Sequence, residues 1–464
     1  MKLDQKLLIA LSVAVAVWRL ALLNVPTGPD VNAWTLMADG IIHGQRLYTD
    51  LFDHKPPGIH LAFIPFVAIF GPGKWAVVVL WLVATWSSMG GLYRLARLVT
   101  PGTALWSAIF FAATCCSLPL WSQAPNAEVL INATLPWAAY FCLTRSPWTC
   151  GLLLFVACSL KPQCAIFFIP ALFMFRRLNV LRLVAPAIVG AALICAWFGL
   201  SGRWVDFWDA NVVYNRWYAG SVARNLMANA HWLFIWPAFM SDLAWTLPLA
   251  CTGMVLGKRP IPAIYAACAL VSVLMMKGHN CYYYQILVPP ACLAAAAGLG
   301  MLGRPGLVGT IAVSLVVACQ IPNILLPPAA WCDRQFGPMY NTGARAADQI
   351  DRALPAERTF YQWGGLVNMW YESKRPPPVG IYSSVFLTEG NPIQDKLRSR
   401  LLSQLDSSRP ALIIVWKMFP PPPAPFLDWL GAHYSRVQTD AILDVWRLSS
   451  GPASRGVPAL PTQP

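Results

Sequence analysis

Two charged clusters between residues 25 and 73 contain side chains that could act on a hydroxyl and on a phosphate. Asp30 stands soon after the first apolar segment, and about twenty-five residues later the chain reads DHKPP from Asp53 to Pro57. The two prolines restrict the backbone after Lys55, so the ammonium group is held in one place. A fixed carboxylate can remove a proton from a hydroxyl, and a fixed cation can bind an anionic phosphate.

Further polar residues are candidates because the topology predicted below places them at the same membrane surface. They are Glu128, Lys161, Tyr214, Arg216, His279 and Tyr284. Tyr214 and Arg216 belong to a loop over residues 201–231, whose asparagine, tyrosine and arginine content suits a sugar or phosphate lining but also suits a passive connector.

Simpler structural explanations stand beside these chemical ones. Asp30 can cap the helix that apolar spacing predicts over residues 31–43. Lys161 can extend toward the interface from an apolar segment, and Glu128 can stabilise a helix N-terminus. His279 can be an ordinary interfacial residue, and the tyrosines at 282–284 are typical of an aromatic belt. The spacing alone does not decide between the two kinds of explanation.

The composition identifies a membrane protein. Of the 464 residues, 57% are hydrophobic and only 12% are charged, and the mean hydropathy is +0.51. Soluble proteins carry about twice that charged fraction. The formal charge is +14, but much of it lies in short loops between apolar runs, and no basic stripe or nucleic-acid reading motif occurs. Nucleic acid is therefore not expected as a partner.

The basic residues between the apolar segments predict the topology. The first helix covers about residues 7–24 with its N-terminus in the cytoplasm, and the pattern predicts about eleven spans in total. The apolar segment 58–71 is short for a span, so we expect it to lie at the interface. If it does not cross, the basic loops all fall on the cytoplasmic side, as the positive-inside rule requires. The loop 25–73 and the C-terminus then lie outside.

The composition changes after the last apolar segment. Residues 1–327 are predicted to form the membrane domain and residues 328–449 a small extracytoplasmic α/β domain, followed by a disordered tail over 450–464. Within the α/β domain, helices are predicted over 344–354, 393–406 and 424–434, and strands over 358–363, 411–417 and 441–448.

These features resemble the GT-C superfamily of membrane glycosyltransferases, in the branch of the protein O-mannosyltransferases and lipid A aminoarabinose transferases. The resemblance covers about residues 7–325: an acid after the first helix, an amphipathic helix, and a Tyr-x-Asp…Lys-Pro-Pro segment. The matching stretches are Tyr48 to Pro57, Asn126 to Glu128, Leu160 to Pro162 and Tyr282 to Pro290. One departure is that Asp30 is followed by Val31, whereas the branch often has paired acids. A metal site that needs two adjacent carboxylates is therefore in doubt, and divalent-metal dependence is left open.

The resemblance implies an α-helical polytopic protein that moves a sugar from a polyprenyl-phosphate carrier to a hydroxyl of an envelope glycan, lipid or protein, with inversion at the sugar carbon. It implies a bacterial inner membrane and a periplasmic active site. Asp30 would be the general base, and Lys55 would bind the departing phosphate with help from His54, Lys161, Arg216 or His279. Asp53, Glu128, Tyr214 and Tyr284 would contact the substrate.

Two other classes of function compete with this one. A secondary transporter or flippase of a lipid-linked or anionic substrate also needs many spans, but such proteins place charges near the membrane midplane and have repeated halves. Here the charges gather near one face, and no repeat is apparent. A structural or assembly protein would explain the C-terminal domain, but it gives Asp30 and Lys55 no purpose.

Overall fold

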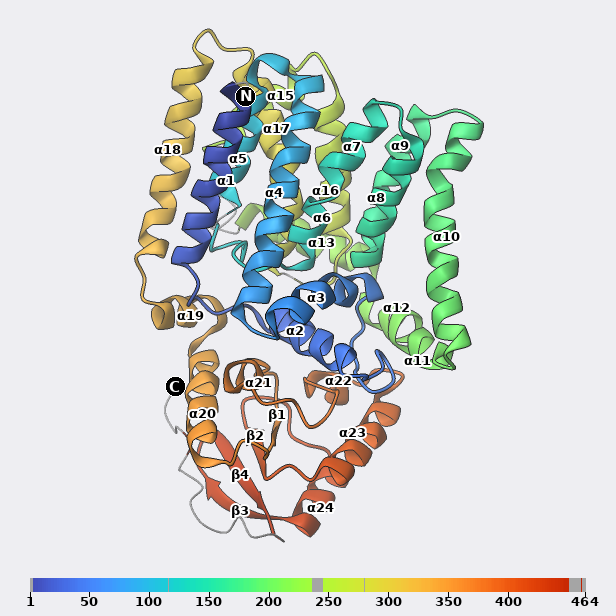
Figure 1. Ribbon diagram of the computed structural model, residues 1–464, viewed down its shortest axis with the longest axis vertical. Helices are drawn as coiled ribbons and strands as arrows, with labels where there is room; N and C mark the ends of the chain where they lie inside the picture. The colour runs from blue at the N-terminus through green and yellow to red at the C-terminus, as the bar shows by residue number, and fades with distance from the viewer. Residues whose placement is uncertain (1–2, 116, 236–244, 279, 450–459, 461–464) are drawn as a thin grey trace.

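The computed structural model describes residues 3–115, 117–235, 245–278, 280–449 and Leu460. These residues form a bundle of helices with a small α/β domain at one end (Figure 1). We call this end of the bundle the domain-facing end. Apart from Leu460, the predicted tail over 450–464 lies outside the described residues.

The bundle is built mainly from apolar helices. They are α1 (Leu3–Ala21), α4 (Lys74–Val99), α5 (Ala104–Thr114), α6 (Ala127–Asn132), α7 (Leu135–Leu143), α8 (Pro147–Leu160), the 3₁₀ helix η2 (Pro162–Phe167), α9 (Phe168–Met174), α10 (Leu178–Leu200), α13 (Val222–Ile235), α15 (Leu247–Val255), α16 (Ile261–Leu274), α17 (Val288–Leu299) and α18 (Pro305–Ile324). Within the described residues, α4, α10 and α18 are each long and apolar enough to cross a membrane. The predicted total of about eleven spans stays a prediction.

Helices α2 (Pro29–Ile42) and α3 (Pro57–Phe70) lie against each other at the domain-facing end rather than along the bundle (Figure 1). Each begins with a proline, whose fixed backbone angle suits the first helical position. Helix α3 ends at Gly71, where φ is +73°. That segment 58–71 does not cross the membrane stays a prediction.

Short helical turns between α10 and α13 lie next to the first loop. They are α11 (Trp204–Trp208), the π-helical turn η3 (Asp209–Tyr214) and α12 (Asn215–Ala219). The hydroxyl of Thr49 in the first loop donates to Asp206 Oδ2 over 2.7 Å. These turns therefore pack against residues that precede them by more than 150 positions.

The C-terminal domain combines helices with one four-stranded sheet. Its helices are α19 (Pro328–Phe336), α20 (Pro338–Ala353), α21 (Asn368–Ser373), α22 (Val385–Thr388), α23 (Gln394–Ser408) and α24 (Ala424–His433). Its strands are β1 (Phe360–Trp363), β2 (Leu412–Trp416), β3 (Tyr434–Thr439) and β4 (Leu443–Leu448). The strand order is β1-β2-β4-β3, with β1 parallel to β2 and the other pairs antiparallel.

The three helices and three strands predicted here are present, within a few residues of their expected ends except at the start of α20. Strand β3 was not predicted. Its residues are mostly exposed, and β3 lies at one edge of the sheet, where it pairs only with β4. An edge strand with few buried side chains lacks the apolar alternation by which strands are recognised.

The α/β domain contacts the first loop through backbone groups of the loop. The Phe52 amide donates to the Gly380 carbonyl over 2.8 Å. Arg400 Nη1 donates to the Tyr48 carbonyl over 2.6 Å, and Gln404 Nε2 donates to the Asp50 carbonyl over 2.9 Å. A Cβ atom at Gly380 would overlap the Asp50 carbonyl oxygen, so this close approach requires glycine.

Candidate active site

A cavity of about 390 Å³ opens at the domain-facing end, between the first loop, η2, α12 and the end of α16. Four cationic side chains line it, namely Lys55, Lys161, Arg216 and Lys277, together with His54 and Tyr283. They come from four separate regions of the chain, within residues 54–56, 160–163, 211–219 and 275–283. We call this space the cationic cavity.

The first loop holds Lys55 in a defined place. The Tyr48 hydroxyl donates to the Lys55 carbonyl over 2.7 Å. The Lys55 ammonium lies 3.0 Å from His54 Nε2. Pro56 directly precedes α3 and fixes the exit of the loop. The backbone is therefore restrained on both sides of Lys55, and the ammonium reaches the cavity from a defined position.

Asp53 holds the backbone of the loop at this lysine. Its Oδ2 accepts from Trp34 Nε1 over 3.0 Å and lies 3.5 Å from His60 Nε2. Its Oδ1 accepts from the amides of His54 and Lys55 over 2.7 and 3.3 Å. Asp53 is 6% exposed and does not line the cavity. Its hydrogen bonds hold the loop, and its predicted contact with substrate stays a prediction.

Burial and neighbouring charges set the protonation of this loop. Burial works against the charged form of Lys55, but the Asp30 carboxylate leads the opposing effects, and the net result raises the pKa of Lys55 above its usual value. Burial, reinforced by the Lys55 charge, lowers the pKa of His54 to about 3. At neutral pH, His54 is therefore a neutral acceptor for the Lys55 ammonium and adds no charge of its own.

Burial alone would raise the pKa of Asp53. The positive charges that His60, His54 and Lys55 can carry, together with the Trp34 hydrogen bond, bring the pKa of Asp53 below its usual value. The Asp53 carboxylate is thus ionised at neutral pH, and its charge compensates the half-buried Lys55 ammonium next to it.

Lys161 enters the cavity from the end of α8, where it forms an ion pair with Glu128 of α6. Its ammonium also lies 4.2 Å from the centre of the Tyr283 ring. Glu128 is fully buried and does not line the cavity, and its carboxylate pairs with Lys161. The substrate contact through Glu128 stays a prediction.

Lys277 was not among the predicted site residues. Its ammonium lies 4.2 Å from the Tyr218 ring and 5.1 Å from the Trp217 ring. Burial raises the pKa of Tyr218 to about 12, so its ring stays neutral beside the lysine. The predicted topology offered a signal, because it put the turn containing Lys277 on the same face as Lys55.

Asp30 does not line the cationic cavity. Its Oδ2 accepts from the Tyr282 hydroxyl over 3.1 Å, and the Tyr282 ring is 4.9 Å from that of Tyr283. Asp30 is half-buried in the first turn of α2. It does not cap that helix, because Gly28 is the N-cap residue. Asp30 is connected to the cavity by these tyrosines and by its electrostatic effect on Lys55.

The remaining predicted residues fall elsewhere. The Tyr214 hydroxyl donates to Glu389 of the α/β domain over 3.2 Å, and the Tyr284 hydroxyl donates to the Asn229 carbonyl over 3.1 Å. Both tyrosines are 1% exposed and neither lines the cavity. His279 lies outside the described residues. The three tyrosines at 282–284 are all buried, which contradicts the alternative that they form an aromatic belt.

The described residues bring together no group of three or more histidine, cysteine, aspartate or glutamate side chains that could hold a metal ion. What they bring together is a set of cations around one cavity, with a carboxylate nearby. This arrangement can bind a phosphate on one side and accept a proton on the other.

Comparison of the structure with solved structures identifies its architecture. The crystal structure of ArnT from Cupriavidus metallidurans bound to undecaprenyl phosphate aligns with a TM-score of 0.65 and 14% identity, over 96% of this chain and 98% of that chain. The apo structure of the same protein aligns with a TM-score of 0.64 and 15% identity, over 95% and 97%. The chain has the GT-C fold.

The GT-C fold is the architecture that the sequence motifs indicated. A third structure, the archaeal oligosaccharyltransferase AglB from Archaeoglobus fulgidus with an inhibitory peptide and a dolichol-phosphate, aligns with a TM-score of 0.45 and 11% identity, over 89% of this chain and 70% of that chain. That score is too low to bear on the fold. No protein-family model matches the sequence, and no curated protein does.

Proposed function

We propose that this chain is an inverting glycosyltransferase that moves a sugar from a polyprenyl-phosphate carrier to a hydroxyl acceptor. The observation that carries the proposal is the convergence of four cations on one cavity, with Asp30 facing Lys55 from outside it. The solved structure of ArnT with undecaprenyl phosphate supports the choice of carrier, because it has the same fold.

The cationic cavity is the site proposed for the carrier phosphate. Lys55, Arg216 and Lys277 bring positive charge to its wall, whereas the charge of Lys161 is shared with Glu128. Charge-assisted hydrogen bonds to phosphate are about twice as strong as neutral ones. The neutral His54 ring accepts from the Lys55 ammonium and so orients its remaining N–H groups toward a ligand.

Asp30 is the group proposed to accept the proton. The acceptor oxygen attacks the sugar carbon that carries the phosphate, and its proton passes to the Asp30 carboxylate. The bond between that carbon and the phosphate oxygen breaks, and the oxygen keeps the electron pair. The phosphate remains on its lipid, where Lys55 and its neighbours stabilise the added charge. Attack from the face opposite the leaving group inverts the sugar carbon.

The membrane orientation is part of the proposal. The basic loops opposite the domain-facing end favour a cytoplasmic position for those loops. The domain-facing end and the α/β domain over 328–449 would then lie outside, in the periplasm of a bacterial inner membrane. In this position the α/β domain can orient an envelope glycan, lipid or protein acceptor above the first loop.

The test compares cells that carry the natural chain, no chain, Asp30→Asn or Lys55→Ala, at matched protein levels. Mass spectrometry of envelope glycans, lipids and proteins should reveal one sugar increment that depends on the natural chain. Both variants should lose that increment, and purified Asp30→Asn should still bind polyprenyl phosphate. Full transfer by Asp30→Asn would overturn the assignment of the base.

A flippase makes a different prediction in the same cells. It would move a lipid-linked sugar across the membrane without forming a new sugar bond. The carrier-linked sugar would then accumulate on the cytoplasmic side when the chain is absent. That result, with no transferred sugar missing from any acceptor, would replace the transferase by a transporter.

A further inference from the structure

The segment between α10 and α13 contains a helix whose middle turn is wider than an α-helix. The ranges of α11, η3 and α12 follow one another without a gap from Trp204 to Ala219. In the π-helical turn η3 the backbone hydrogen bonds join residues five positions apart, a geometry that is rare and occurs mostly as single turns at functional sites. A return of η3 to the α-helical spacing of four would rewind this turn and rotate α12 relative to α11. Contacts that hold η3 therefore also set the direction in which α12 faces.

The first end of η3 is held by α23 of the α/β domain. The Lys396 ammonium lies 2.8 Å from Asp206 Oδ1 and 2.7 Å from Asp209 Oδ2, and Asp209 is the first residue of η3. Arg400 Nη2 lies 3.0 Å from Asp206 Oδ1. Burial alone would raise the pKa of Asp206, but the hydrogen bonds from Lys396 and Thr49 bring this pKa below its usual value. The domain thus holds ionised carboxylates at the point where the winding changes.

The far end of η3 is held by α22 and the residue after it. Tyr214, the last residue of η3, is buried, and its hydroxyl donates to Glu389 Oε2 over 3.2 Å. The Phe386 ring of α22 lies 5.8 Å from the Tyr214 ring and 5.8 Å from the His54 ring. Figure 1 shows α22 and α23 on the side of the α/β domain toward α11 and α12. Both ends of η3 therefore contact the same domain.

The opposite side of this helix forms a wall of the cationic cavity. Asn211 of η3 lines the cavity, as do Asn215 and Arg216 of α12. Asn215 Nδ2 donates to the Asn211 carbonyl over 3.1 Å and to the His54 carbonyl over 2.7 Å. The Asn215 amide thus joins η3 to the backbone of the loop that carries Lys55. Rotation of α12 would break the bond to His54 and displace Arg216 from the other cations.

We propose that the α/β domain sets the geometry of the cationic cavity through η3, with Lys396 and Glu389 as positioning residues. This inference rests on the proposed function, because it takes the cavity as the site of the carrier phosphate. Neither residue lines the cavity, so each acts through the turn that it holds. The domain that would orient the acceptor is then also the domain that shapes the phosphate site. By linkage, a docked domain that strengthens carrier binding is itself docked more firmly when the carrier is bound.

A simpler electrostatic explanation makes the opposite prediction at Asp209. If Lys396 only attracted the phosphate from a distance, removal of the Asp209 charge would leave the surroundings more positive and raise phosphate affinity. If Lys396 positions η3, removal of the Asp209 charge takes away one of its two carboxylate partners, so the affinity falls. The sign of the Asp209→Asn effect therefore decides between the two explanations.

The test measures the affinity of the full chain in nanodiscs for a short polyprenyl phosphate. Lys396→Ala and Asp209→Asn should each lower this affinity by about three- to tenfold. Lys396→Arg should restore most of it, because a guanidinium can bind two carboxylates. A rise in affinity for Asp209→Asn, or wild-type affinity for Lys396→Ala, would overturn the proposal.

The matched control is Lys417→Ala. The Lys417 side chain is 37% exposed and pairs with Asp444 over 2.9 Å, whereas that of Lys396 is 39% exposed. Both partners of the control pair belong to the α/β domain, so its loss should leave carrier affinity unchanged. A loss as large as that of Lys396→Ala would show that the effect does not depend on η3, and it would overturn the proposal.

A double-mutant cycle tests the route through α12. In an Arg216→Ala background the cation that η3 positions is already absent, so Lys396→Ala should cost less than about twofold further. A loss as large as in the wild type would overturn this route. Glu389→Ala should also lower the affinity, and Glu389→Gln should restore it, because the amide oxygen can still accept from Tyr214. Equal affinities of these two variants would remove Glu389 from the proposal.

Hydrogen exchange separates this inference from the proposed function. Backbone amides of residues 209–216, measured without any carrier, should exchange faster in Lys396→Ala than in Lys417→Ala. Unchanged exchange in Lys396→Ala would overturn the hold on η3 and leave the proposed function standing. Failure of the wild type to bind any polyprenyl phosphate would overturn the proposed function, whatever the exchange rates show.

Discussion

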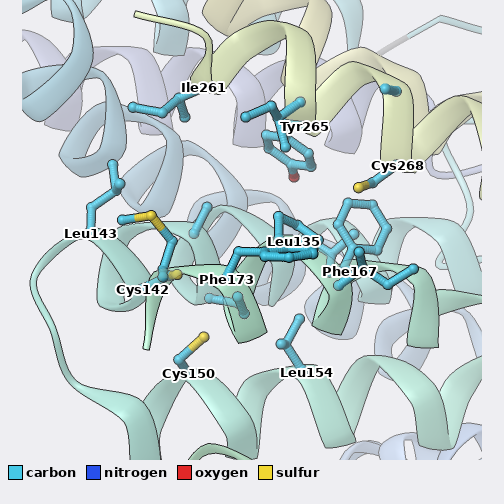
Figure 2. A pocket seen from close by; sticks show the side chains of 18 residues that line it. Leu135, Cys142, Leu143, Cys150, Leu154, Phe167, Phe173, Ile261, Tyr265 and Cys268 are labelled. Carbon is cyan, nitrogen blue, oxygen red and sulfur yellow. The ribbon is translucent and has the colours of Figure 1, made fainter. Parts of the chain in front are cut away.

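A second cavity of about 460 Å³ lies between α7, α8, α9 and α16, where apolar side chains line it (Figure 2), and we call it the apolar cavity. The cationic cavity has a similar volume, about 390 Å³, but the two are built in opposite ways. In the cationic cavity, Lys55, Lys161 and Lys277 each have a named partner that fixes the ammonium. In the apolar cavity, only non-directional packing defines the space. A phosphate needs charges at set positions, whereas a hydrocarbon chain needs only volume. Single substitutions should therefore act strongly at the first cavity and weakly at the second.

The largest expected effect tests whether the cationic side performs chemistry as well as binding. Asp30→Asn removes the base but keeps an acceptor for Tyr282. We expect transfer to fall by about 10²–10⁴-fold, the usual contribution of general-base assistance. Carrier binding, measured with the purified protein, should stay within error of the wild type. A loss of binding as large as the loss of transfer would place Asp30 with the phosphate ligands.

The next effect tests the charges themselves. Lys55→Ala removes a half-buried ammonium, and a hydrogen bond to a charged group contributes about 1.5–3 kcal/mol. We expect affinity for polyprenyl phosphate to fall by about 10- to 100-fold. Lys417→Ala in the α/β domain is the matched control, because Lys417 does not line the cavity. Equal affinity for the two variants would remove Lys55 from the phosphate site.

A stability measurement tests how the loop under the cationic cavity is held. The pKa of His54 is about 3 in the folded protein and about 6.5 in an unfolded chain. The folded state therefore binds fewer protons between these values, and its stability falls as pH drops below about 6.5. From pH 6.5 to 5 the loss should reach about 2 kcal/mol. In His54→Gln this part of the slope should disappear, as thermal unfolding in detergent would show. An unchanged slope would mean that His54 is not held neutral.

The smallest expected effect sharpens the contrast between the cavities. Affinity for a short polyprenyl phosphate should fall with added salt, because it depends on exposed and half-buried charges. Ala267→Trp lies in the apolar cavity and should leave this salt dependence unchanged. Lys277→Ala should make it shallower. If Ala267→Trp altered the salt dependence as much as Lys277→Ala, the two cavities would not be separate in function.

The sequence predicted two kinds of feature. One is the membrane face of a residue, which follows from the positions of the basic loops, and the other is the strands that are rich in apolar residues. Lys55, Lys161 and Arg216 were placed on one face by counting basic loops, and the structure brings them to one cavity. The strands β1, β2 and β4 were predicted because each contains several apolar residues, and the structure buries some or all of them. Whether the cavity binds phosphate stays a proposal.

Other residues could not be placed from the sequence because their partners come from distant parts of the fold. Asp53 looks exposed in a polar loop, but Trp34 and His60 bury it. The tyrosines at 282–284 lie on the 3₁₀ helix η4 (Cys281–Leu287), which has about three residues per turn. Their side chains therefore point in three directions, toward Asp30, the cavity and the Asn229 carbonyl.

The hydrogen bonds between the α/β domain and the first loop have a consequence for which residues of the loop can change. On the loop side, three of the hydrogen bonds use peptide groups, those of Tyr48, Asp50 and Phe52. Peptide groups are the same whatever residue carries them. These three hydrogen bonds can therefore persist when the side chains of Tyr48 and Asp50 change, whereas the ring contacts of Phe52 and His54 with Phe386 depend on the side chains, and Gly380 must stay small. The same three hydrogen bonds can join this domain to loops of different sequence.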